Sequence, residues 1–257
     1  MARSGPRNSC ASGGISSGKP GLASGSRGSG RGGSLAGAVA GGCSPRTGRA
    51  GGATSSADRA ATGAGRQDVP GDPVRVTEVS AAALGAVHLE AAARTVIDVG
   101  AEEGRAIKTT DAGGVVDFAI NEKCAAGSGA FTEAMARALE TPVEQIGELS
   151  MASTQAIPMN AQCAVFAESE VVSLLHAKTP KSDIARAVHD AIANRVVSMA
   201  RKVGINEDVV VIGGVARNVG FISAIQRELE LKVKVPQDPD FVSALGAALH
   251  AVRVATA

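Results

Sequence analysis

Aromatic side chains are almost absent from this chain of 257 residues, which has no Trp, no Tyr and only five Phe. Proteins that bind single-stranded nucleic acid stack its bases on aromatic rings, so this mode of binding is not expected here. After residue 60 the chain holds 18 Lys and Arg against 24 Asp and Glu. The net negative charge of this part of the chain also argues against nucleic-acid binding, and we expect no nucleic-acid partner.

Long apolar runs are lacking as well. No run reaches the roughly 18–20 apolar residues of a transmembrane helix. The N-terminus has no continuous apolar segment of the kind found in secretory signals. The four cysteines are scattered and do not have the spacing of a disulfide framework. We therefore expect a cytoplasmic protein without a membrane partner.

Periodic apolar residues are missing from the first 60 residues, which contain 16 of the 32 glycines, eight Lys or Arg and one acidic residue. Such a segment cannot bury enough apolar surface to offset the entropy lost on ordering. We predict a disordered Gly/Ser/Arg-rich segment over 1–61. Two other interpretations stay open. One is an Arg/Gly-rich arm that binds RNA, and the other is a frame-shift artefact, because GC-rich DNA translated out of frame gives this composition.

The remainder, 62–257, has the periodicity of a folded α/β domain. Strands are predicted over 95–99, 105–109, 115–120, 209–212 and 231–235. Helices are predicted over 76–89, 125–140, 142–149, 164–177, 182–203, 218–229 and 241–252. Three leading strands followed by alternating helices and strands indicate a mixed sheet with helices on both faces. This order matches the second half of the actin/Hsp70/sugar-kinase fold, which is ribonuclease H-like, with the first half largely missing.

A glycine-containing turn follows the first predicted strand, in the sequence Asp98-Val-Gly-Ala-Glu-Glu-Gly104. A carboxylate at the end of a buried strand suits a loop that lies against phosphates, with Asp98 holding a water bound to Mg²⁺. Gly100 lets the backbone approach a ligand closely, and Glu102 is the second candidate for a catalytic carboxylate. The alternative is an ordinary turn between a strand and a hairpin.

A second turn, Gly213-Gly214, follows the strand predicted over 209–212 and precedes a helix. Ligands of α/β proteins bind at the carboxyl ends of strands, where a glycine pair admits a flat or phosphorylated group. Arg217 is a candidate to stack on a base, and Asn218 is a candidate to cap the helix. Together the two turns predict a nucleotide-binding site.

Two cysteines of the ordered part, Cys124 and Cys163, each lie directly before a predicted helix. The helix dipole and free backbone N–H groups stabilise a thiolate at such a position. Gly127 and Gly129 would allow a second backbone or a cluster to approach. A [4Fe–4S] cluster usually has four cysteine ligands, so a cluster here would be shared by two chains. The alternative is that both cysteines are small hydrophobic residues of the core.

Six segments carry a resemblance to one known family: TVIDVGAEEGR, NEKCAAGSGAF, AQCAVFAESEVVSLL, IANRVVSMARKVG, VVVIGGVARNVG and ALGAALHA. Together, over about 62–252, they resemble the ATP-dependent electron activators of 2-hydroxyacyl-CoA dehydratases and benzoyl-CoA reductases. Ala-Glu-Glu after Asp98-Val-Gly looks more like the smaller of the ATP-binding subunits of benzoyl-CoA reductase. The dehydratase activators usually have Gly-Gln-Asp there.

The resemblance implies an actin-like ATPase that binds ATP and Mg²⁺. It also implies a [4Fe–4S] cluster between two subunits, each contributing Cys124 and Cys163. ATP hydrolysis in that family changes the angle between the cluster-bearing helices and drives one electron to a low potential. The implied partners are a second ATP-binding subunit of the same fold in a homo- or heterodimer, reductase or dehydratase subunits that bind the CoA thioester, and a ferredoxin-like electron donor.

The sequence therefore predicts the ATP-binding subunit of a benzoyl-CoA reductase-type complex, which acts in anaerobic aromatic degradation. The first alternative is an activator of a 2-hydroxyacyl-CoA dehydratase. The second is a cluster-bearing interaction subunit without ATPase activity, because the family's first phosphate loop, Asp-x-Gly-Ser/Thr, does not occur before Asp98. A sugar or acetate kinase of the same fold is the third, and it would leave both cysteines unexplained.

Overall fold

The computed structural model describes residues 38–41, 59–121, 129–159 and 163–256. Its strands are β1 (Ala38–Gly41), β2 (Arg59–Thr62), β3 (Val74–Arg75), β4 (Thr95–Val99), β5 (Gly104–Thr109), β6 (Val115–Asn121) and β7 (Val209–Ile212). Its α-helices are α1 (Glu78–Leu89), α2 (Gly129–Ala138), α3 (Ile146–Met151), α4 (Ala164–His176), α5 (Lys181–Val203), α6 (Val219–Leu229) and α7 (Val242–Thr256). Short 3₁₀ helices are η2 (Ala64–Gln67), η3 (Gly214–Arg217) and η4 (Pro239–Phe241).

The larger sheet has its strands in the order β6-β5-β4-β7. Strands β4, β5 and β6 are antiparallel neighbours, whereas β7 runs parallel to β4. All five residues of β4 are buried, as expected for an apolar strand at the centre of a mixed sheet. Because β4 and β7 are parallel, the turns that follow them lie at the same edge of the sheet. The predicted mixed sheet is thus confirmed.

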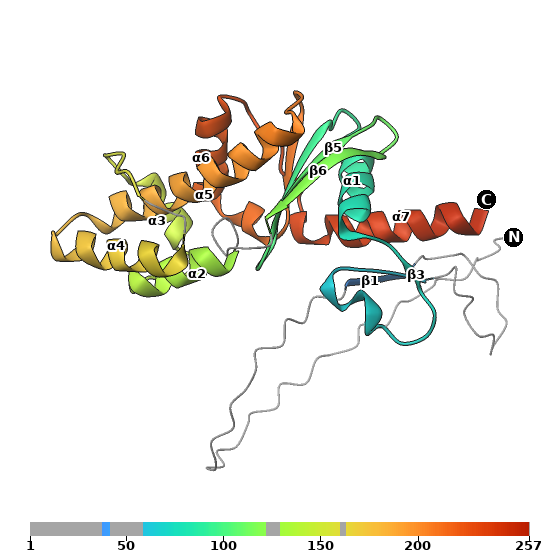
Figure 1. The fold of residues 1–257 in the computed structure, drawn as a ribbon, viewed down its shortest axis with the longest axis horizontal. Helices are drawn as coiled ribbons and strands as arrows, with labels where there is room; N and C mark the ends of the chain where they lie inside the picture. Colours follow the sequence, from blue (N-terminus) through green and yellow to red (C-terminus); the bar gives the residue numbers. More distant parts are fainter. Residues whose placement is uncertain (1–37, 42–58, 122–128, 160–162, 257) are drawn as a thin grey trace, which may run out of the picture. The chain divides into compact units, whose positions relative to one another are not determined.

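Helices cover both faces of this sheet (Figure 1). The side chains of β4 alternate between the two faces: Ile97 and Val99 pack with residues of α2, α5 and α6, whereas Val96 packs with residues of α1. On the second face α1 lies very close to α7. Gly246 permits this approach, since a Cβ atom there would collide with the carbonyl oxygen of Ala81. The alternating pattern of β4 therefore builds a core on each side of the sheet.

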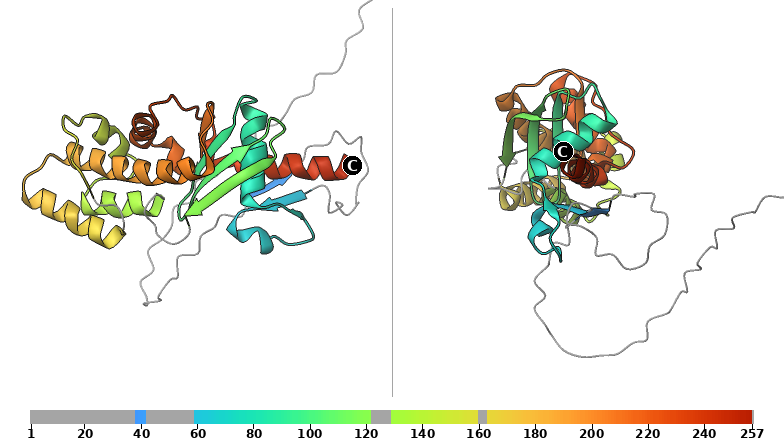
Figure 2. Two further views of the ribbon diagram at one scale, coloured as in Figure 1. Left: turned by 45° about the horizontal axis from the view of Figure 1, so that its top comes forward. Right: turned by 90° about the vertical axis from the view of Figure 1, so that its right-hand side faces the viewer.

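A small second sheet, in the order β1-β2-β3, lies beside α7 (Figure 2). Strand β2 is antiparallel to β1 and parallel to β3. Ala60 of β2 belongs to a small core of alanine and valine residues that also contains Ala247 and Ala251 of α7. Strand β2 spans the predicted boundary between the disordered segment, 1–61, and the folded domain, 62–257. Strand β1 lies within the segment predicted to be disordered.

Helices α2, α3 and α4 form an insertion between β6 and α5. Helix α2 packs against α4, and α3 packs against both α5 and α6. Three leading strands, a helical insertion and a returning parallel strand make up the second half of an actin/Hsp70/sugar-kinase-like fold. As the sequence predicts, the first half is largely missing from the described residues. None of the described helices is long and apolar enough to cross a membrane.

Two predicted elements differ from the structure. Instead of a strand over 231–235 there is a single bridge between Lys234 and Val210, held by two backbone hydrogen bonds of 2.9 Å. Pro236 follows closely, and it has no N–H group with which to extend the ladder. Helix α3 begins later than predicted. The other predicted strands and helices are confirmed in the described part of the chain, with ends that differ by a few residues.

Candidate functional site

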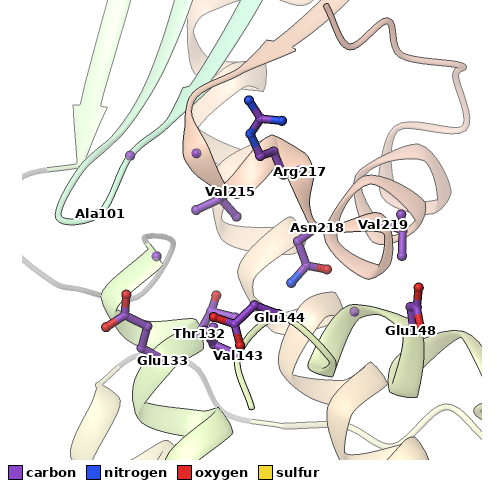
Figure 3. A pocket seen from close by; sticks show the side chains of 14 residues that line it. Ala101, Thr132, Glu133, Val143, Glu144, Glu148, Val215, Arg217, Asn218 and Val219 are labelled. Carbon is purple, nitrogen blue, oxygen red and sulfur yellow. The ribbon is translucent and has the colours of Figure 1, made fainter. Parts of the chain in front are cut away.

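A cavity of about 420 Å³ lies where the turns after β4 and β7 meet the helical insertion (Figure 3). Its lining comes from segments that are far apart in the sequence. The lining residues are Gly100, Ala101, Gly129, Thr132, Glu133, Val143, Glu144, Gly147, Glu148, Gly214, Val215, Arg217, Asn218 and Val219. The fold therefore brings together five of the predicted binding residues: Gly100, Gly129, Gly214, Arg217 and Asn218.

Backbone hydrogen bonds hold the turn after β4 against the start of α2. The N–H of Gly129 donates to the carbonyl oxygen of Gly100, and the N–H of Ala130 donates to that of Ala101, each over 2.8 Å. A Cβ atom at Gly129 would lie 3.3 Å from the Gly100 oxygen, so a larger residue would push the two segments apart. The absence of a side chain at Gly129 thus permits the close approach of the two backbones.

The turn after β7 also depends on glycine. Gly213 has a φ of 88°, a left-handed conformation that other residues rarely adopt. A Cβ atom there would also collide with the carbonyl oxygen of Val99 at the end of β4. The neighbouring Gly214 faces open space, with no atom within 4 Å of its Cβ position. A ligand can therefore lie directly against the backbone at Gly214.

Asn218 caps α6, as predicted. Its Oδ1 accepts hydrogen bonds from the backbone N–H groups of Gly220, at 3.0 Å, and Phe221, at 3.1 Å. The cap satisfies two donors that the first turn of a helix otherwise leaves free. It also fixes the N-terminus of α6 at the cavity, where the positive end of the helix dipole favours electron-rich ligand groups.

Arg217, the predicted base-stacking residue, is bound to two aspartates. Its Nε donates to Asp240 Oδ1 at 2.7 Å, and its Nη2 donates to Asp240 Oδ2 at 3.1 Å and to Asp238 Oδ1 at 3.4 Å. The hydrogen bond with Asp240 is the main cause of the raised pKa of Arg217. Figure 3 shows the guanidinium pointing away from the glutamates of the opposite wall. The positive charge of Arg217 is therefore held in one orientation and largely compensated.

The wall opposite Arg217 is acidic, and the sequence analysis does not predict it. Glu133, Glu144 and Glu148 line this wall (Figure 3), and Thr132, which is 3% exposed, lies beside them. The Thr132 Oγ1 has no hydrogen-bond partner among the residues that the structure describes. This hydroxyl is therefore an unused hydrogen-bonding group next to the cavity. No motif reveals these residues, because they lie on separate segments that only folding brings together.

Asp98 lies at the end of β4, as predicted, but does not line this cavity. The side chain is buried, and its Oδ2 accepts a hydrogen bond from Arg105 Nη1 at 3.0 Å. The same guanidinium donates to Glu103, at 2.6 Å, and to Glu78. Burial is the main cause, and the negative charge of Glu103 the second, of an Asp98 pKa raised to about 6. Asp98 thus belongs to a network of three carboxylates around one guanidinium.

The remaining predicted residues lie elsewhere. Glu102 is exposed and does not line the cavity. Cys163 is the N-cap residue of α4; it is partly exposed, and its thiol makes no capping hydrogen bond. Cys124 and Gly127 lie outside the described residues. No group of three or more His, Cys, Asp or Glu side chains suited to a metal ion occurs in the described part of the chain.

This fold, with a glycine-lined cavity where two parallel strands end, is of the type found in actin-like ATPases. The sequence profile of the BadF/BadG/BcrA/BcrD ATPase family matches residues 47–251. The chain belongs to this family.

Relatives and solved structures agree with this assignment. The activator of lactoyl-CoA dehydratase from Anaerotignum propionicum is 41% identical over 195 residues, which cover 76% of this chain and 75% of the relative. Component A of the (R)-2-hydroxyglutaryl-CoA dehydratase of Acidaminococcus fermentans has a TM-score of 0.74 at 39% identity, over 76% of both chains. The activator of the 2-hydroxyisocaproyl-CoA dehydratase from Clostridium difficile, with bound ADPNP, has a TM-score of 0.73 at 37% identity, over 76% of this chain and 73% of the other.

These comparisons correct the preference for benzoyl-CoA reductase. A subunit of the benzoyl-CoA reductase from Thauera aromatica is 34% identical over 173 residues, which cover 65% of this chain and 61% of the relative. The preference depended on Ala101, Glu102 and Glu103, in a turn where the first two residues are exposed. Exposed turn positions vary at little structural cost, so they carry less weight than a match along the chain. The alternative, a dehydratase activator, is better supported.

Proposed function

We propose that this chain is the ATP-binding, iron–sulfur subunit of an activator of a 2-hydroxyacyl-CoA dehydratase, in which ATP hydrolysis drives low-potential electron transfer. The observation that carries the proposal is the convergence of the turns after β4 and β7 on one cavity, in a chain of an ATPase family. The similar activator with bound ADPNP supports an adenine nucleotide as the ligand.

The charges of the cavity indicate which end of the nucleotide it holds. The wall formed by the helical insertion carries three glutamates, and the charge of Arg217 is compensated by its aspartates. An acidic wall repels phosphate oxygens, but it accepts hydrogen bonds from hydroxyl and amino groups. The nucleoside therefore suits the acidic wall of the cavity, and the phosphates suit its glycine-lined part, at the exposed backbone of Gly214 and beside the partly exposed Gly100.

Asp98 is the carboxylate that we propose acts on the phosphate side. A Cβ atom added at Gly213 would lie 2.7 Å from Asp98 Oδ1, so the carboxylate reaches the turn after β7. With a pKa of about 6, Asp98 is mostly ionised at pH 7, as a partner of Mg²⁺-bound water must be. Bound Mg²⁺ would neutralise charge on the phosphates. Glu102, which is exposed on the turn after β4, is the proposed second carboxylate.

Cys163 fits the role of a cluster ligand. Its thiol is free and partly exposed, and it lies at the N-terminus of the 13-residue helix α4. With Cys124 it gives two ligands per chain, so a four-cysteine cluster requires two chains. Val165 and Phe166 are 67% and 68% exposed and offer apolar surface that a second chain would bury. When bound, the cluster would supply a one-electron carrier.

The proposed partners follow from these sites. A second ATP-binding subunit of the same fold would complete the cluster. A dehydratase component that binds the 2-hydroxyacyl-CoA thioester would accept the electron, in line with the names of the similar activators. A ferredoxin-like protein would supply the electron.

One observation favours a second candidate, a cluster-bearing subunit without ATPase activity. The sequence before Asp98 contains no Asp-x-Gly-Ser/Thr loop, which the resemblance assigns to the β- and γ-phosphates. Such a chain would still hold the nucleoside in the cavity. Hydrolysis, rather than binding, therefore separates the two candidates.

The test is ATP turnover by anaerobically purified protein, with and without the dehydratase component and a reductant. The proposal predicts ATP hydrolysis, and electron transfer to the dehydratase only when ATP is present. Asp98→Asn should keep ADP binding and lower hydrolysis by about a hundredfold. ATP binding without hydrolysis in the unchanged chain would support the second candidate. Failure to bind ATP or ADP would contradict both.

A further inference from the structure

A second cavity, of about 500 Å³, lies between the edge strand β6 and helix α5 and shares no lining residue with the first. Its charged residues are Arg195 and Lys202, and no Asp or Glu is among the described residues that line it. The polar Asn194 and Ser198 and the apolar Met199 also contribute. Their spacing of three to four residues places the polar groups on one face of α5. The cavity is thus a basic site with neutral hydrogen-bonding groups and an apolar part.

The positive charge here is a local exception in a chain that is acidic after residue 60. Among the described residues, Arg195 donates one side-chain hydrogen bond, a long one of 3.4 Å to Asn121 Oδ1. Neither Arg195 nor Lys202 forms an ion pair with a carboxylate in the described part of the chain. The adjacent Arg201, by contrast, pairs with Glu228 at 2.9 Å. These two cations, which have no carboxylate partner among the described residues, therefore attract an anionic partner to this face of α5.

Cys163, one of the two proposed cluster cysteines, lies within a short reach of this cavity. Asn121 and Met159 line it, and Cys124 follows Asn121 by three residues while Cys163 follows Met159 by four. A fully extended chain spans at most ~3.6 Å per residue. The Cα of Cys163 is therefore within about 14 Å of that of Met159. A partner bound in the cavity is close to the proposed electron carrier.

We infer that this basic cavity is the docking site for an acidic segment of the redox protein that delivers electrons to the cluster. Carboxylates of that segment pair with Arg195 and Lys202, and Asn194 and Ser198 bind its backbone. Charge complementarity of this kind accelerates and orients the encounter. Two cations and one small cavity make a small interface, which is typical of redox partners that bind and leave in each cycle. The inference rests on the proposed function, because it requires the cluster.

The test is the rate at which the full chain, purified with its cluster, is reduced by reduced ferredoxin and by dithionite, which needs no docking. Arg195→Gln/Lys202→Gln should lower the second-order rate constant with ferredoxin about tenfold at low salt and flatten its salt dependence. The dithionite rate and the iron content should not change. Arg75→Gln/Lys232→Gln removes the same charge from exposed positions elsewhere, and it should leave the ferredoxin rate nearly unchanged.

Three results would overturn the inference. The first is a ferredoxin rate that is unchanged, or reduced equally, in the two double variants. The second is electron transfer to the dehydratase that falls while reduction by ferredoxin is unchanged, because the cavity would then bind the acceptor. The third is iron-free protein, which would contradict the proposed function and this inference together, whereas the first two results leave the proposed function intact.

Discussion

Gly147 of α3 packs directly against Gly220 of α6. A Cβ atom at Gly220 would lie 2.8 Å from the carbonyl oxygen of Gly147 and would collide with Oγ of Ser150. Residues of both segments line the candidate nucleotide cavity. The contact between the two glycines therefore sets the distance between two walls of that cavity.

Gly220→Ala should destabilise the fold by about 1–3 kcal/mol, the usual cost of overpacking, and should weaken ADP binding because α3 and α6 move apart. Urea denaturation measures the stability, and calorimetry measures the binding. Gly214→Ala is the control for stability, because its Cβ position has no neighbour within 4 Å. Equal stability of the two variants would show that the helix contact tolerates a methyl group.

The pKa of Asp98 predicts a pH-dependent stability. Burial first, and Glu103 second, raise the pKa of Asp98 from 3.8 to about 6 in the folded chain. The folded state then holds this proton more tightly than the unfolded state does. The resulting stabilisation, at most about 3 kcal/mol, is complete below about pH 4 and is lost as the pH rises through about 6.

Asp98→Asn cannot ionise and should remove this part of the pH dependence. Urea denaturation of both proteins between pH 4 and 7 measures it, because all other titrating groups are common to the two chains. We expect the difference in unfolding free energy, variant minus unchanged protein, to increase as the pH rises. A difference that stays constant over this range would contradict the raised pKa.

The buried hydroxyl of Thr132 predicts opposite effects on stability and binding. Its Oγ1 has no partner among the described residues, so Thr132→Val should leave the free energy of unfolding unchanged or higher. If a nucleotide atom bonds to this hydroxyl, ADP affinity should fall by up to about tenfold. Thr62→Val is the matched control, because the Thr62 hydroxyl is also buried without a partner but lies in β2. Unchanged ADP affinity in Thr132→Val would remove this hydroxyl from the site.

The sequence predicts those parts of the site that depend on backbone geometry. Gly213 is required by its positive φ, and this need is visible as a glycine after an apolar strand. Asn218 caps α6 for a local reason that a motif also reveals. Such residues are predictable because their roles depend on neighbours in the chain.

Residues whose roles depend on tertiary packing are not predictable in this way. Thr132 and Glu144 lie on different segments of the helical insertion, and only folding brings them to the same cavity. The charge of Arg217 is visible in the sequence, but its pairing with Asp240 is not, because 22 intervening residues separate them. The wrong prediction of a strand over 231–235 has a local cause instead, because Pro236, which has no N–H group, closely follows the single bridge at Lys234.

The central claim, a cluster shared by two ATPase subunits, is tested most directly by the iron content of protein purified without oxygen. We predict four irons per pair of chains, lost in Cys163→Ala and retained in Cys43→Ala, a cysteine with no proposed role. An iron-free protein, or a Cys163→Ala variant that keeps its iron, would contradict the claim.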